Sequence, residues 1–320
     1  MSNQRRQMRV RSAESVAREV KALELVPVDG ESLHPWAPGA HIRVWLPDGD
    51  TRAYSLIGSR SDDTRYSIAI RLDEHGRGGS RYMHALVPGD LLAISDPRND
   101  FPLQQTATFH TLVAGGIGIT PLMAMAEELS SDGRRFRLVY CARTPDHAAF
   151  LDQMQQRFGS NVVAHFDEGH AKRAFDIAKL LSEPNAGEHV YVCGPKGMVD
   201  AARRSTSHWP EGTFHTEIFT NAPLPTEDET DEGFEIVLGS SDEKLQVPPG
   251  KSILRVLLEK GLPVEYYCEQ GSCGLCTTGI LSGLVEHRDV VLNDEEKASQ
   301  KIMQVCVSRP LPGEVLVLDL

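Results

Sequence analysis

Short runs of alternating apolar and polar residues fill the first third of the chain, from Met8 to about Leu103. Runs such as HIRVWLP, RYSIAIRL and DLLAIS have the two-residue period of half-buried strands, and Pro-Gly and Gly-Asp turns separate them. Many short strands joined by tight turns are typical of an antiparallel β-barrel. The pattern therefore predicts a barrel domain over residues 1–105.

The pattern changes after this region. FHTLVAGGIGITPLMAMAEEL is an apolar strand, a glycine turn and a helix, while FRLVYCAR and EHVYVCGP supply further strands between helical stretches. Strands that alternate with helices build a parallel sheet. We expect an α/β domain over residues 106–222.

The segment NAPLPTEDETDEG contains two prolines, five acidic residues and no hydrophobic periodicity. It predicts an extended, self-repelling linker over residues 223–233. Beyond it, FEIVLGSSDEKLQVPPG is typical of a β-hairpin, and SILRVLLEKG of a short helix capped by Ser252. A third domain is expected over residues 234–320.

Composition and charge narrow the function classes. A length of 320 residues favours several domains, and a formal net charge of −12 argues against nucleic-acid binding, which needs concentrated Lys and Arg. No apolar run approaches the roughly 18 residues of a membrane span, and no apolar segment follows the basic start MSNQRRQMRVR. A soluble, cytoplasmic protein is expected.

The acidic residues concentrate in the last third, where 18 Asp or Glu stand against 8 Lys or Arg from Thr226 to Leu320. Such a field can steer a basic partner, although solubility explains it equally well.

Four of the six cysteines lie near the C-terminus. CEQGSCGLC followed by Cys306 gives C-x4-C-x2-C and a distant fourth cysteine, the spacing of a plant-type [2Fe-2S] ferredoxin. The predicted ligands are Cys268, Cys273, Cys276 and Cys306. Gly271 and Gly274 allow the loop to fold closely around a cluster. A four-cysteine zinc site is the alternative, but such sites usually pair two separate knuckles.

Two other cysteines, Cys141 and Cys193, fall in predicted strands. We expect Cys141 to be a small buried apolar residue.

Candidate flavin residues follow one barrel strand. RAYSL places Arg52, Tyr54 and Ser55 together, which offers a cation for a phosphate, an aromatic surface and a hydroxyl for the flavin ring. Downstream, HGRGGSRYMHAL predicts a helix that opens on Gly78, Gly79 and Ser80, where free backbone amides can hold a phosphate. Taken singly, a surface strand and a plain turn explain these segments too.

A candidate nucleotide site comes from two turns of the α/β domain. GGIGITP, which begins at Gly115, follows an apolar strand and opens a helix, although it lacks the full dehydrogenase fingerprint. VYVCGPKGM places Cys193 at the carboxyl end of a later strand, the edge at which α/β sheets bind ligands. Glycine-rich turns that bind nothing remain the alternative.

RAYSL, RGGS, GGIGITP, YVCGP, EIF and the C-terminal cysteines, in this order, resemble the phthalate dioxygenase reductase family, which includes vanillate demethylase reductases. The resemblance covers essentially the whole chain. It implies a ferredoxin-reductase-like flavin barrel, a nicotinamide nucleotide domain and a C-terminal β-grasp ferredoxin. It further implies that electrons pass from NADH through FMN and the [2Fe-2S] cluster, one at a time, to a Rieske non-haem iron oxygenase.

The resemblance also assigns residues. FMN, rather than FAD, would be held by Arg52, Tyr54, Ser55, Arg71, Gly78, Gly79 and Ser80, with Ser55 near flavin N5. Leu72 departs from the family, which carries a second cation there.

The nicotinamide nucleotide would lie against Gly115, Gly116 and Thr120, with Cys193 near its ring, so Ser55, Thr120 and Cys193 are the candidate catalytic residues. Phe219 would shield the flavin, unless it is a plain core aromatic.

Three alternatives remain open. CARTPDHAAF shows Arg143 but no cluster of cations for a 2′-phosphate, which favours NADH over NADPH. The same electron chain could serve a cytochrome P450 or another acceptor. A more distant alternative is a nucleotide-responsive, metal-binding signalling protein.

Overall fold

The computed structural model describes residues 5–58, 60, 62–74, 76, 78–219, 233–266, 271 and 274–320. The chain divides into two compact units, Met1–Glu217 and Ile218–Leu320. The predicted linker at 223–233 falls outside the described residues except for Gly233. Among the described residues, no helix is both long and apolar enough to cross a membrane.

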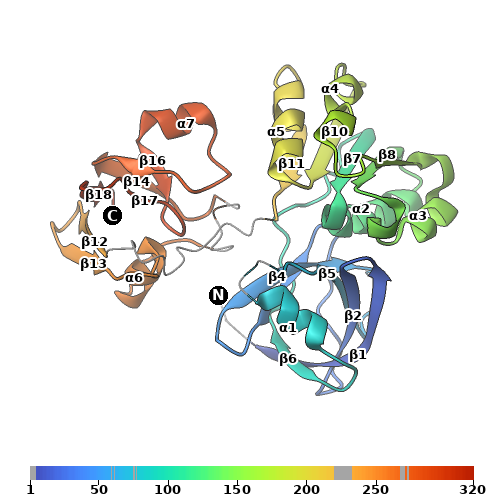
Figure 1. The fold of residues 1–320 in the computed structure, drawn as a ribbon, viewed down its shortest axis with the longest axis horizontal. Coiled ribbons are helices and arrows are strands. Elements are labelled where there is room, and N and C mark those ends of the chain that lie inside the picture. Colours follow the sequence, from blue (N-terminus) through green and yellow to red (C-terminus); the bar gives the residue numbers. More distant parts are fainter. Residues whose placement is uncertain are drawn as a thin grey trace. The chain divides into compact units, whose positions relative to one another are not determined.

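The first unit begins with a closed antiparallel barrel of order β1-β2-β5-β4-β3-β6 (Figure 1), as the alternating pattern predicted. Its elements are β1 (Arg6–Ala17), β2 (Val20–Pro27), β3 (His41–Trp45), β4 (Thr51–Ile57), β5 (Tyr66–Arg71), α1 (Gly79–Ala85) and β6 (Leu91–Ile94). Inward-facing residues such as Ile42, Leu56 and Ile68 are fully buried and fill the barrel.

A five-stranded parallel sheet of order β11-β10-β7-β8-β9 follows. Its strands are β7 (Phe109–Gly115), β8 (Phe136–Ala142), β9 (Val162–Phe166), β10 (Glu188–Cys193) and β11 (Phe214–Glu217). Its helices are α2 (Ile119–Ser131), α3 (Leu151–Phe158), α4 (Ile177–Leu180) and α5 (Lys196–Ser205), with the 3₁₀ turns η1 (Gly116–Gly118), η2 (Pro145–His147), η3 (Gly159–Asn161) and η4 (Ala171–Arg173).

The barrel and the sheet share one hydrophobic cluster. Val20, Ile57 and Phe101 from the barrel side pack with Leu122 and Tyr191 from the sheet side. At roughly 25 cal/mol per Å² of apolar surface, such continuous burial holds the two parts together. The candidate flavin and nucleotide sites of the barrel and the sheet therefore belong to one compact unit.

The second unit contains a mixed five-stranded sheet of order β13-β12-β18-β14-β16 and a two-stranded sheet of β15 and β17. Its elements are β12 (Phe234–Leu238), β13 (Lys244–Val247), α6 (Ile253–Glu259), β14 (Thr277–Ser282), β15 (Val285–Glu286), α7 (Asp294–Ser299), β16 (Ile302–Gln304), β17 (Arg309–Pro310) and β18 (Leu316–Leu318). The hairpin β12–β13 is present, and the Ser252 hydroxyl accepts from the Arg255 amide at 3.3 Å at the start of α6. Both sequence predictions are confirmed.

Candidate functional site

A basic cradle forms where β4 meets the start of α1. An ideal Cβ on Gly79 would lie 2.8 Å from Nε of Arg52, so the guanidinium covers the first turn of the helix. Gly78 takes a positive φ of 84° to open that turn. Arg52 is held from below, since its Nη1 donates to Asp50 Oδ2 at 2.6 Å and to the Thr51 carbonyl at 2.8 Å. A cation beside unpaired helix amides suits a phosphate.

Ser80 and Arg71 are placed less directly than Arg52 to bind a phosphate through their side chains. The Ser80 hydroxyl accepts from the Asp73 amide at 3.0 Å and donates to the Asp73 carbonyl at 3.2 Å, so it closes the loop before α1. What Ser80 can offer a phosphate is its backbone. Arg71 ends β5 with an exposed side chain.

Tyr54 and Ser55 lie next to each other on β4. Burial raises the pKa of the Tyr54 phenol, while the nearby Arg52 cation opposes that shift. Ser55 is 4% exposed, and no described residue hydrogen-bonds its Oγ. A buried hydroxyl without a partner is costly in a folded chain, so this atom is suited to a polar atom of a ligand.

The two glycine-rich turns of the nucleotide half meet backbone to backbone. An ideal Cβ on Gly118 would lie 2.1 Å from the Cys193 carbonyl oxygen, and one on Gly115 would lie 2.6 Å from Pro195 Cδ. Gly116 takes a positive φ of 55° at the start of η1. Gly115 and Gly118 are therefore packed against the turn that follows β10, whereas the Cβ direction of Gly116 is open, so a pyrophosphate can approach the backbone there at the carboxyl edge of the sheet. Gly118 was within the motif but had received no role.

Thr120 is 2% exposed, and its hydroxyl donates to the Ile117 carbonyl at 3.0 Å. It thus stabilises η1 from inside. Cys193 is fully buried, and burial, followed by the charge of Glu217, raises the pKa of its thiol well above the ordinary value. Cys193 is therefore a neutral thiol rather than a nucleophile.

The structure adds two residues that the sequence had not suggested, Glu217 and His41. Glu217 pairs in register with Cys193, and burial, with a smaller contribution from Asp100, raises its pKa to about 8. His41 Nδ1 lies 4.0 Å from Glu217 Oε1, and His41 is the register partner of Ser55. Directly opposed residues of antiparallel strands share a face. Ser55, His41, Glu217 and Cys193 thus connect the barrel to the sheet edge.

Glu217 ends β11 and is the first residue of the EIF motif, so its place in that motif was the available signal. Phe219 lies beyond the first unit and is 42% exposed, so its role against a flavin stays a prediction.

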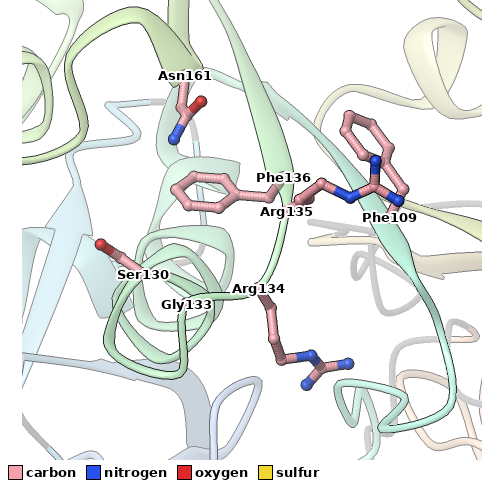
Figure 2. Close-up of a pocket in the computed structure, with 7 residues that line it drawn as sticks. All are labelled: Phe109, Ser130, Gly133, Arg134, Arg135, Phe136 and Asn161. Carbon is pink, nitrogen blue, oxygen red and sulfur yellow. The ribbon is translucent and has the colours of Figure 1, made fainter.

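A pocket of about 410 Å³ lies at the opposite, amino end of β7 and β8. Its lining residues are Phe109, Ser130, Gly133, Arg134, Arg135, Phe136 and Asn161 (Figure 2). Arg134 and Arg135 point in different directions, and Arg134 donates to the Gln104 carbonyl at 2.8 Å. This arginine anchors the segment between barrel and sheet. Because ligands of α/β sheets bind at carboxyl ends, we assign this pocket no part in the site.

In the second unit, two of the four predicted cluster ligands are described. Cys276 and Cys306 are 2% and 1% exposed, and the Val305 amide donates to the Cys276 carbonyl at 3.4 Å. Cys268 and Cys273 lie outside the described residues, and the remaining ones bring no three metal ligands together. Soft sulfur donors in a buried setting fit an iron–sulfur cluster.

Two glycines of the cysteine segment have backbone angles that favour glycine. Gly271 and Gly274 have φ angles of 70° and 77°. An ideal Cβ on Gly271 would lie 2.6 Å from Val307 Cγ2 and 3.0 Å from Asp289 Cα. Gly271 therefore lies close to the segment that carries the fourth cysteine, which leaves no room for a larger residue at this position.

The fold and the candidate site define an iron–sulfur oxidoreductase of the ferredoxin-reductase type. It combines a barrel with a phosphate cradle, a parallel-sheet nucleotide domain and a cysteine-bearing ferredoxin unit. Residues 112–204 match the family model for the oxidoreductase NAD-binding domain, and residues 236–311 match that for the 2Fe-2S iron-sulfur cluster binding domain.

Full-length relatives are more specific. The chain is 40% identical to the phthalate dioxygenase reductase of Burkholderia cepacia, over 98% of this chain and 97% of that protein. It is 39% identical to the carnitine monooxygenase reductase subunit of Escherichia coli (strain K12), over 98% of each chain. A solved phthalate dioxygenase reductase, described as a modular structure for electron transfer from pyridine nucleotides to [2Fe-2S], superimposes with a TM-score of 0.80 at 39% identity, covering 98% of this chain and 97% of that one.

The chain therefore belongs to the phthalate dioxygenase reductase family. The expected fold class and the expected NAD-linked, iron–sulfur oxidoreductase chemistry are confirmed. A further solved structure, an intact type IV self-sufficient cytochrome P450 monooxygenase, is similar at 35% identity with a TM-score of 0.73, over 99% of this chain but 41% of that one.

Proposed function

We propose that this protein is the reductase component of a Rieske-type oxygenase system, which draws electrons from NADH and delivers them singly through FMN and a [2Fe-2S] cluster. The observation that carries the proposal is full-length similarity to reductase subunits of oxygenases, with an NAD-binding domain followed by a 2Fe-2S domain. The domains run over 1–105, 106–222 and 234–320, joined by the linker 223–233, and the protein acts in the cytoplasm.

FMN is held in the barrel. Arg52 and the Gly78–Ser80 turn bind its phosphate, Arg71 adds a peripheral cation, and Tyr54 lies along the ring. The Ser55 hydroxyl, which no described residue hydrogen-bonds, would serve as the polar partner of flavin N5. When bound, FMN exchanges two electrons with a nicotinamide and single electrons with an iron–sulfur centre.

NADH approaches the carboxyl edge of the parallel sheet. Gly116, whose Cβ direction is open, leaves space for its pyrophosphate, and Gly115 lets this turn pack against Pro195 and Met198. Thr120 stabilises the turn that carries them. The neutral Cys193 thiol packs beside the nicotinamide and excludes water. Glu217, whose pKa is raised to about 8, retains its carboxyl proton at neutral pH and adds no full negative charge to this site.

The segment after β8 carries Arg143 but no cluster of cations for a 2′-phosphate, which favours NADH over NADPH. The cluster is held by Cys268, Cys273, Cys276 and Cys306.

The partner is proposed to meet an acidic ferredoxin surface. The capping box of α7 places Asp294, Glu295 and Glu296 in one turn, and the last third of the chain carries most of the net negative charge. Long-range attraction of this kind is screened by salt within about 10 Å at 0.1 M. Electron delivery to the oxygenase should therefore slow as salt rises, and salt-independent delivery would reject the acidic surface as docking site.

The second candidate function is electron supply to a cytochrome P450, which the full-length similarity to part of a self-sufficient P450 favours. Assays with a Rieske oxygenase and a P450 as alternative acceptors separate the two.

An anaerobic titration tests the proposed function. The purified protein should show a flavin band at about 450 nm with a sulfide-to-iron shoulder, and NADH should bleach both. Extraction should release FMN. A protein that contains no flavin, or that NADH leaves unbleached, would contradict the proposal.

A Ser55→Ala variant should bind FMN yet accept hydride more slowly. Arg60→Gln, an exposed change elsewhere in the barrel half, is the matched control.

A further inference from the structure

The side chain of Gln304 lies directly against one of the proposed cluster ligands. Gln304 ends β16, is 0% exposed, and pairs in register with Thr277 on β14. The Cys276 thiol donates to Gln304 Oε1 at 3.3 Å, while Gln304 Nε2 donates to Thr277 Oγ1 at 2.6 Å. Gln304 is also two residues before Cys306, so its amide lies between the segments that supply two ligands.

This arrangement must change when the cluster is present. A cysteine that binds iron is a thiolate and has no proton to donate, so Oε1 would face a negatively charged sulfur. Turning the amide over exchanges its oxygen and nitrogen without changing its volume. Nε2 then points at the Cys276 sulfur. Oε1 then faces the Thr277 hydroxyl. This hydroxyl donates to the Gly274 carbonyl at 2.5 Å, and it can rotate to donate to Oε1 instead.

We propose that Gln304 is a positioning residue of the [2Fe-2S] centre, which donates an N–H···S hydrogen bond to the Cys276 thiolate and raises the reduction potential of the cluster. This inference rests on the proposed function, because it requires the cluster. Hydrogen bonds to the sulfurs are one of the factors that set such potentials. The donor stabilises the reduced cluster more than the oxidised one, since the reduced form carries one more negative charge, and full burial strengthens the effect.

The test is an EPR-monitored redox titration of the full-length protein with three substitutions. Gln304→Met keeps the volume and removes the donor, and should shift the one-electron equilibrium about tenfold toward the oxidised cluster, equivalent to about 59 mV. Gln304→Glu, which adds an anion, should shift it further in the same direction. Gln246→Met, on the exposed side of β13, is the matched control and should leave the potential unchanged.

A Gln304→Met protein that holds its cluster at the wild-type potential overturns the proposal. If that variant does not assemble a cluster, Thr277→Val decides, because it leaves Gln304 in place but removes the hydroxyl that fixes its amide. A smaller shift toward the oxidised cluster then supports the hydrogen bond, and an unchanged potential assigns Gln304 to packing alone. Wild-type protein without the EPR signal of a reduced cluster is a different result, which contradicts the proposed function itself.

Discussion

The two units of this chain build their sites in different ways. In Met1–Glu217 the site is assembled from residues far apart in sequence, such as Ser55, Gly118 and Cys193, and depends on one hydrophobic cluster shared by barrel and sheet. In Ile218–Leu320 three proposed ligands come from one loop and the fourth from a segment that packs against it. The first site is a product of tertiary packing, and the second of local spacing. Single substitutions at the first site should therefore weaken ligand binding by degrees, whereas loss of one ligand at the second site should abolish cluster binding.

The largest effect is expected from removing a cluster ligand. Cys306→Ser should abolish cluster binding, because three thiolates cannot complete the coordination of two irons. Iron content and EPR should fall to background, and one-electron delivery should stop, while NADH still reduces the flavin. Cys141→Ala, which removes a buried thiol from β8, should keep its cluster. If the serine variant kept a full cluster, the expectation that the second site depends on all four cysteines would be wrong.

The next effect concerns the close approach of the two nucleotide turns. Gly118→Ala places a Cβ 2.1 Å from the Cys193 carbonyl, so the backbones must separate. We expect a loss of about 1–3 kcal/mol of stability and a raised KM for NADH. Gly197→Ala is the matched change, because no atom lies within 4 Å of its Cβ in α5, and it should stabilise by about 0.5–1 kcal/mol. Denaturant unfolding and steady-state kinetics measure both, and equal behaviour of the two variants would reject the close approach.

The FMN cradle should respond more gradually. Arg52→Gln should weaken FMN binding roughly tenfold to a hundredfold, as expected when a charged hydrogen bond of about 1.5–3 kcal/mol is lost. Arg71→Gln should have a smaller effect, because that side chain is exposed and solvent screens its charge. Fluorescence of released flavin gives both dissociation constants. A larger loss of FMN affinity in the Arg71 variant than in the Arg52 variant would contradict a phosphate site at the start of α1.

The last prediction concerns the pH dependence of stability. The pKa of Glu217 is raised from 4.5 to about 8 by burial, so between these pH values the folded protein holds a proton that the unfolded chain releases. Its contribution to stability is complete below pH 4.5 and is lost as pH rises through 8, with a slope of at most about 1.4 kcal/mol per pH unit. Glu217→Gln should flatten this slope in chemical denaturation measured from pH 5 to 9. An unchanged slope would show that the carboxyl is not the group responsible.

Features governed by local chemistry were predictable from the sequence. The barrel strands, the β12–β13 hairpin and the Ser252 cap follow from patterns within a few residues, as does the opening of α1 on Gly79. The contact of Glu217 with His41 was not predictable, because it depends on two strands in different sheets. The role of Gly118 was hidden for the same reason, since the atom it must avoid belongs to Cys193, 75 positions later in the printed sequence.

The polar partners of side chains were also beyond the sequence. The sequence indicated that the backbone amides at Ser80 can hold a phosphate, but it did not indicate that the Ser80 hydroxyl is engaged by Asp73. The Thr120 hydroxyl is likewise used to close η1. Residue type indicates what a side chain can bind, and only the folded chain determines which partner it finds first.

The position of β18 has a consequence for how the protein is made. This strand follows all four proposed ligand cysteines in the chain, yet it lies between β12 and β14, pairing with the first in parallel and with the second in antiparallel fashion. During synthesis the thiols leave the ribosome before the sheet that frames them can be completed. The cysteine segments are therefore framed by the complete sheet only after β18 has been synthesised, whereas the barrel and the nucleotide sheet can fold earlier.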